Sequence, residues 1–126
     1  MYFHKIEKSF PIYRGRFVII LSNDRDKLVN MLPDVDFDYL YAHSVLTSWK
    51  GMEGYIVILN MDSQYRKIHM GTIAHEAVHI ANMLFEQRGI TLSAVNDEPF
   101  AYLVEWIVDE IHKFVNKNNF FDKILA

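Results

Sequence analysis

The stretch "TIAHEAVHIANMLFEQRG" (residues 72–89) contains two histidines with three residues between them, and a glutamate directly follows the first. Apolar residues recur through it at the three- and four-residue spacing of one helix face, at Ile73, Ala77, Ile80, Ala81, Leu84 and Phe85. We predict Thr72 as the N-cap and Gly89 as the stop of a helix over 72–88. On that helix His75 and His79 lie one turn apart on the same face.

The hydrophobic period changes from strand-like to helical near residue 70. Before this point the sequence predicts a short helix at 23–32, capped by Asn23 or Asp24, and three strands, at 14–22, 38–50 and 54–61. The last of these strands is apolar on both faces, as expected for a covered central strand. A second long helix is predicted at about 97–115. Because strands come first and long helices last, the class is α+β, with a single domain over 1–126.

The composition narrows the classes of function. The chain has 126 residues, a formal charge of -3 and scattered basic residues, which argues against nucleic-acid binding. Its N-terminus lacks the apolar core of a secretory signal, and no apolar run approaches the roughly 20 residues that span a membrane. A cytoplasmic location is therefore expected, in the producing cell or in a host if the gene belongs to a phage. Without cysteine, a zinc site must use His, Asp or Glu.

The residues "HEAVH" (75–79) form the pattern H-E-x-x-H. Two imidazoles one turn apart can converge on one cation, since Zn–N distances are about 2.0–2.1 Å. Glu76 leaves the helix about 100° away from His75, where it can accept a proton from a metal-bound water instead of binding the metal. About one or two shuffled chains per hundred would contain this motif, so the alternative is an amphipathic helix whose histidines face solvent.

A catalytic zinc ion needs a third protein ligand and an open fourth position. Glu98, at the start of the second long helix, is the predicted third ligand, with Asp97 as its nearest rival. The connection 89–96 must then run back along the first helix, and its length allows this at roughly 3.3 Å per residue. The alternative is that both acids are favoured by the dipole of a helix N-terminus.

Tyr102 follows Glu98 by four residues, on the same face of the second long helix. We predict that its hydroxyl either hydrogen-bonds a ligand histidine or stabilises a developing oxyanion. The alternative is a tyrosine at the edge of the core, with its hydroxyl in water.

The segments "HEAVH" (75–79) and "DEPFAY" (97–102) together resemble the gluzincin zinc metallopeptidases, and most of all the short zincin-like proteins of phages and bacterial genomes. The resemblance covers residues 54 to about 110. It implies that His75, His79 and Glu98 bind Zn²⁺ and that Glu76 is the general base. It also implies a minimal zincin-like core, a small, mostly antiparallel sheet of three or four strands packed against an active-site helix and a glutamate helix. The strand at 54–61 would border the cleft, where a peptide can add alongside it.

The chain also departs from that family. Larger gluzincins often have an aspartate where this chain has Tyr102, and a second lobe for which this chain is too short. The cleft is therefore expected to be open, or completed by a partner chain or a bound protein substrate. We expect a small zinc-dependent hydrolase, a peptidase of narrow specificity for a peptide or protein substrate. The alternative is a zincin-fold binding or regulatory module that acts on a partner protein without cleaving it.

Overall fold

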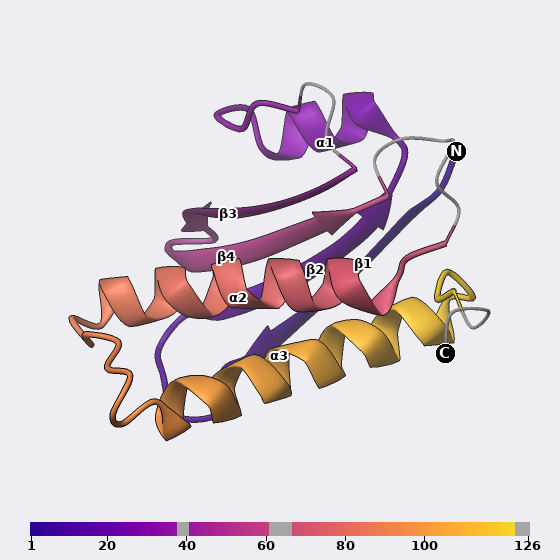
Figure 1. Cartoon of the computed structure of the whole chain (residues 1–126). Helices are drawn as coiled ribbons and strands as arrows, with labels where there is room; N and C mark the ends of the chain where they lie inside the picture. The colour runs from indigo at the N-terminus through magenta and orange to yellow at the C-terminus, as the bar shows by residue number, and fades with distance from the viewer. Residues whose placement is uncertain (38–40, 61–66, 123–126) are drawn as a thin grey trace.

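The computed structural model describes residues 1–37, 41–60 and 67–122, which form one sheet and three helices (Figure 1). In chain order the elements are β1 (Phe3–Ser9), β2 (Arg16–Ser22), α1 (Arg25–Met31), β3 (Ala42–Trp49), β4 (Met52–Leu59), α2 (Met70–Gln87) and α3 (Glu98–Lys117). The α+β class predicted from the sequence is confirmed. No helix in these described ranges is long and apolar enough to cross a membrane.

The four strands form a mixed sheet in the order β1-β2-β4-β3. The central strands β2 and β4 are parallel, and each edge strand is antiparallel to its neighbour. Both central strands are buried along almost their whole length, β2 from Phe17 onward and β4 from Gly54 onward. Such continuous apolar runs are typical of strands that are covered on both faces.

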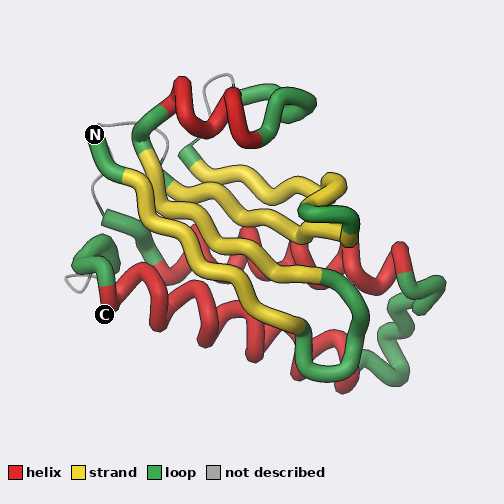
Figure 2. Tube along the Cα trace, turned by 180° about the vertical axis from the view of Figure 1, so that it is seen from behind, coloured by secondary structure: helices red, strands yellow, loops and turns green. Residues whose placement is uncertain are grey.

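Helices α2 and α3 cover one face of the sheet and α1 packs on the other (Figures 1 and 2). Each face of the sheet has its own apolar core, and successive residues of β2 point to opposite faces. Ile19 packs in the core with α2 and α3, whereas Ile20 packs in the other core with Leu28 of α1. Helix α2 contacts β3 and β4, and α3 contacts β2. The edge strand β3 therefore lies on the side of α2 that faces away from α3.

The two long helices are antiparallel. The rings of Phe85, in the last turn of α2, and Phe100, in the first turn of α3, lie 5.4 Å apart between centroids. At the opposite end, Ile68 just before α2 forms a bridge with Phe121 just after α3. The start of α3 is thus beside the end of α2.

The predicted strands correspond to β2, β3 and β4, and the predicted helices to α1, α2 and α3, with ends shifted by a few residues. Residues 38–40 and 61, at the ends of two predicted strands, lie outside the described residues. Asp24 caps α1, and its carboxylate accepts a 3.2 Å hydrogen bond from the backbone N–H of Lys27. The alternative cap, Asn23, instead accepts from the backbone N–H of Tyr2 at 2.9 Å.

Two expectations are wrong, and one strand was not predicted. Thr72 is not the N-cap of α2, because the helix already begins at Met70 and His69 is the capping residue. The strand at 54–61 does not border a cleft as an edge strand, because β4 pairs on both sides and β3 forms the edge. The additional strand is β1, whose residues are half-buried or exposed and include several charges, so the apolar pattern gives little signal.

Candidate metal centre

His75 and His79 lie on the solvent face of α2 with their ring nitrogens together. The Nε2 atoms are 3.2 Å apart, and the two rings meet edge to face with centroids 4.8 Å apart. The helix fixes this geometry, because its buried residues, among them Ile73, Ala77 and Ile80, hold the opposite face against the sheet. The predicted convergence of the two histidines is therefore present in the fold.

The distance between the two Nε2 atoms is chemically informative. It fits an N–H···N hydrogen bond between two neutral imidazoles. It also fits two ligands of one tetrahedral zinc ion, because Zn–N bonds of about 2.0–2.1 Å place two nitrogens about 3.3 Å apart. The side chain of His75 is 68% exposed, so this pair is open to an ion from solvent. The residues present thus fit two of the ligand positions of a zinc site.

Glu76 lies beside His75 and is hydrogen-bonded to the edge strand β3. Its Oε1 accepts a 2.7 Å hydrogen bond from the hydroxyl of Ser44 on β3, and the residue is only 5% exposed. Its Oε2 lies 3.9 Å from Nε2 of His75. One carboxylate oxygen is therefore bound to Ser44, while the other lies near His75 but beyond hydrogen-bond distance.

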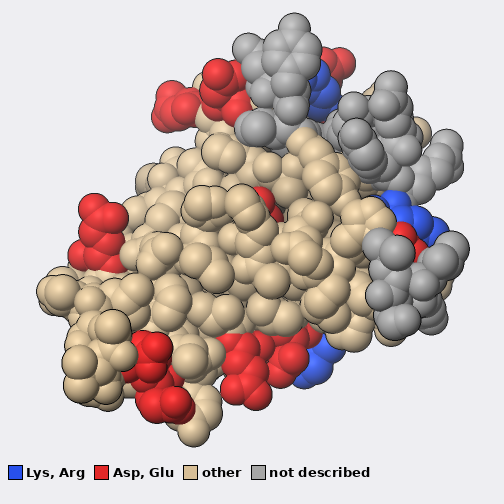
Figure 3. All heavy atoms as spheres, in the orientation of Figure 1, with Lys and Arg blue, Asp and Glu red and all other residues tan. Residues whose placement is uncertain are grey.

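A shallow hollow of about 330 Å³ opens beside this carboxylate. Three of the residues that line it have small side chains: Ala42 from β3, and Gly71 and Thr72 from the first turn of α2. The lining also includes Tyr41, His75 and Glu76. Figure 3 shows that charged side chains are sparse on the surface over α2 and that acidic ones gather on the side of α3. Among these lining residues, Glu76 supplies the carboxylate that a molecule in the hollow would meet.

Glu98 and Asp97, the predicted third ligand and its rival, are not brought to the histidine pair. Both are exposed, and Glu98 is the first residue of α3, which begins beside Phe85. The histidines are in the first half of α2, and the connection after it does not run back along the helix as the prediction required. Within 1–37, 41–60 and 67–122, no group of three or more His, Cys, Asp or Glu side chains could hold a metal ion.

Tyr102 also lies apart from the pair. It is 66% exposed and lines a different, apolar hollow together with residues of the β1–β2 connection. His69, just before α2, has its Nδ1 3.1 Å from a carboxylate oxygen of Asp122. Of the residues predicted for the site, the fold therefore assembles His75, Glu76 and His79, and it adds Ser44, which has no local sequence signal because it comes 32 residues before Glu76.

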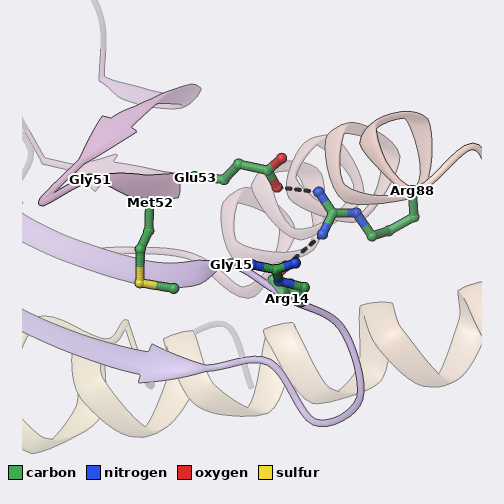
Figure 4. A pocket seen from close by; sticks show the side chains of 6 residues that line it. All are labelled: Arg14, Gly15, Gly51, Met52, Glu53 and Arg88. Carbon is green, nitrogen blue, oxygen red and sulfur yellow. Dashed lines mark hydrogen bonds and ion pairs between the residues drawn. The ribbon is translucent and has the colours of Figure 1, made fainter.

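The far end of α2 is fixed to the sheet by a polar network. Arg88 forms an ion pair with Glu53 of β4 and donates a 3.4 Å hydrogen bond to the carbonyl of Arg14, as Figure 4 shows. The hydroxyl of Tyr55 also donates to Glu53, at 2.7 Å, and burial together with this hydrogen bond raises the pKa of the Tyr55 phenol. These contacts leave a hollow of about 310 Å³ between the strand ends. They anchor the C-terminal end of α2 to β4 and to the β1–β2 connection.

Comparison with known protein families, with curated proteins and with solved structures found no match to this chain. The resemblance to gluzincins therefore remains a prediction from the two motifs, and the geometry of α2 and β3 is the basis for assigning a function.

Proposed function

We propose that this protein is a small zinc-dependent hydrolase that acts on peptides. The observation that carries the proposal is the 3.2 Å approach of the two Nε2 atoms, together with a buried carboxylate whose Oε2 lies 3.9 Å from Nε2 of His75. His75 and His79 would hold the ion, and zinc would supply Lewis acidity for a reacting carbonyl group.

Glu76 has the position of a general base and acid. Oε2 faces the reaction space, so it can accept a proton from the attacking water and return that proton to the leaving amine. Oε1 accepts the hydrogen bond from Ser44, which orients it toward β3. This orientation supports the proposal that Glu76 transfers protons and does not bind the ion directly.

The edge strand β3 offers a way to bind an extended peptide. One side of β3 pairs with β4, and no strand of the described chain pairs with its other side. A peptide that adds to this edge gains main-chain hydrogen bonds and runs past the hollow at Ala42. In this proposal β3 takes the place that the resemblance assigned to the strand at 54–61.

A second candidate function is a module that binds a partner protein without cleaving it. The observation that favours it is that the described residues bring no third acidic or histidine ligand to the pair. Catalytic zinc sites usually have three protein ligands, so a two-histidine site would hold the ion weakly or require a ligand from the partner.

The decisive experiment compares cleavage of a peptide library by the wild type and by Glu76→Gln, both loaded with zinc. The glutamine keeps the shape and still accepts the hydrogen bond from Ser44, but it cannot take a proton. We expect cleavage by the wild type and a loss of about 10²- to 10⁴-fold in the variant. Equal cleavage by both would refute the role of Glu76. If the zinc-loaded wild type cleaves no peptide, the non-cleaving module is the better description.

A further inference from the structure

The hollow at the C-terminal end of α2 lies where three segments of the chain meet, and its volume is about 310 Å³ (Figure 4). The β1–β2 connection, the β3–β4 hairpin and the end of α2 line it, with Arg14, Gly15, Gly51, Met52, Glu53 and Arg88. None of these residues lines the hollow beside Glu76. It is therefore distinct from the candidate metal centre.

The lining of this hollow carries more positive than negative charge. Arg88 forms an ion pair with Glu53, so these two charges offset each other. Arg14 is exposed, and its side chain forms no salt bridge or hydrogen bond with any residue in 1–37, 41–60 and 67–122. One positive charge is therefore uncompensated in a concave surface, where it attracts an anion more strongly than on a flat one.

The backbone that carries Arg14 is fixed from two sides. The carbonyl of Arg14 accepts a 3.4 Å hydrogen bond from Arg88. Gly15 is buried and has a φ of +120°, which L side chains rarely adopt, and a Cβ atom there would lie 2.7 Å from the ring of Tyr55. A ligand that binds Arg14 therefore does not first have to order this loop, which lowers the entropic cost of binding.

We infer that this hollow binds the carboxylate group of an organic ligand. The planar guanidinium of Arg14 can donate two parallel hydrogen bonds to a carboxylate. The single negative charge of a carboxylate matches the one uncompensated charge of the lining, whereas a phosphate dianion would be repelled more strongly by Glu53. Met52 also lines the hollow and is 47% exposed, so an apolar group attached to the carboxylate can pack against its side chain.

The test is an NMR titration of the isotope-labelled full chain with N-acetyl-leucine, in the absence of zinc. We expect saturable shifts of the amide signals of Gly15 and Gly51, and none with N-acetyl-leucinamide, which has nearly the same shape but no charge. Arg14→Gln should weaken binding by at least about fivefold, because the guanidinium is lost. A tripeptide that ends in leucine distinguishes the sources of the carboxylate: tighter binding than N-acetyl-leucine indicates a peptide end, and equal binding indicates a small organic acid.

Arg16→Gln is the matched control, because it removes the same charge from a nearby arginine that donates to Ser9 and does not line the hollow. It should leave the affinity within about twofold of the wild type, since no direct contact is lost. The inference is overturned if the wild type shows no saturable shifts, if the amide binds equally well, or if Arg14→Gln weakens binding no more than Arg16→Gln. Tighter binding of inorganic phosphate at the same residues also overturns it. Neither zinc nor cleavage enters the experiment, so these outcomes are independent of the proposed hydrolase.

Discussion

The hydroxyl of Ser44 lies 2.7 Å from Oε1 of Glu76 and donates a hydrogen bond to it, which joins the edge strand to the helix that carries the histidine pair. The carboxylate is nearly buried, so this hydroxyl replaces much of the hydration that Glu76 has in the unfolded chain. The contact also sets which oxygen of Glu76 faces the histidines. It is therefore expected to matter for stability as well as for chemistry.

The first prediction concerns this contact. Ser44→Ala should lower the free energy of unfolding by about 1–3 kcal/mol, because a buried carboxylate oxygen loses its partner. Urea denaturation of both proteins at neutral pH measures the difference. Ser48→Ala, an exposed serine on the same strand, is the matched control and should change stability by less than about 0.5 kcal/mol. Equal effects of the two substitutions would show that the Ser44 hydrogen bond contributes nothing.

The second prediction is that the wild type binds one zinc ion per chain through the two histidines. His79→Ala should weaken zinc binding by more than about tenfold, whereas His43→Ala, a histidine on β3, should leave it unchanged. Titration calorimetry and elemental analysis of purified protein provide the measurement. Near-zero zinc in the wild type even after zinc is supplied would refute the site.

Glu98→Ala gives a separate test of the acidic third ligand. Because α3 begins beside Phe85, away from the pair, we expect zinc affinity within about threefold of the wild type, well short of the effect of losing a ligand. A loss as large as that of His79→Ala would mean that zinc binding moves the first turn of α3 to the histidines, as the sequence motif predicts.

The third prediction is a pH dependence that arises from Glu7. Hydrogen bonds from Lys50 and from the indole N–H of Trp49 lower the pKa of Glu7 from 4.5 to about 2. A carboxyl group whose pKa is lower in the folded state stabilises the fold above its unfolded pKa, and this contribution is lost as the pH falls. The contribution of Glu7 should therefore be complete above about pH 4.5 and decline toward pH 2.

The measurement is the free energy of unfolding of the wild type and of Glu7→Gln across this pH range. The difference between them should shrink as the pH falls from 5 to 2, and added salt should reduce it, because the partner Lys50 is 67% exposed. Glu86→Gln, at an exposed glutamate of α2, serves as control and should show no such trend. A constant difference for Glu7→Gln would contradict the assignment.

The fourth prediction contrasts two glycines. A Cβ atom at Gly54 would lie 2.5 Å from the Cβ of Trp49, so Gly54→Ala must displace the β3–β4 hairpin and should cost about 1–3 kcal/mol. At Gly71, in the first turn of α2, a Cβ meets nothing within 4 Å, and alanine should stabilise the helix by up to about 1 kcal/mol. Thermal unfolding of both variants checks the opposite signs. A neutral Gly54→Ala would mean that the hairpin can shift freely.

The sequence predicts the elements of the site better than their assembly. A spacing of four residues on a helix determines that His75 and His79 share a face, whatever the rest of the fold does. Glu98 depends instead on how α3 docks, and its place follows from the contact between Phe85 and Phe100, which no local pattern encodes. Ser44 depends on the strand order, because β3 becomes the edge next to α2 only when β4 pairs with β2.

The same reasoning explains the N-terminal strand. Phe3 and Ile6 are partly buried, but Lys5 lies between them in the sequence and Glu7 and Lys8 follow Ile6. The segment therefore lacks the alternation of apolar and polar residues that predicts a strand. The strand pairs with β2, and its charged side chains bind on both faces of the sheet. Glu7 accepts hydrogen bonds from the indole N–H of Trp49 and from Lys50, whereas Lys8 forms an ion pair with Glu110 of α3.

The parallel pairing of β2 with β4 has a consequence for how the chain assembles. The β1–β2 and β3–β4 hairpins and the α2–α3 pair each join neighbours along the chain, so their loops close at small entropic cost. The pairing of Arg16 with Gly54 instead joins distant segments, and it must form before either apolar core is complete. Until the two hairpins meet, the inner edges of β2 and β4 are both open. That interval is when the nascent protein is most prone to aggregate, because each apolar inner strand can pair with another chain in place of its native neighbour.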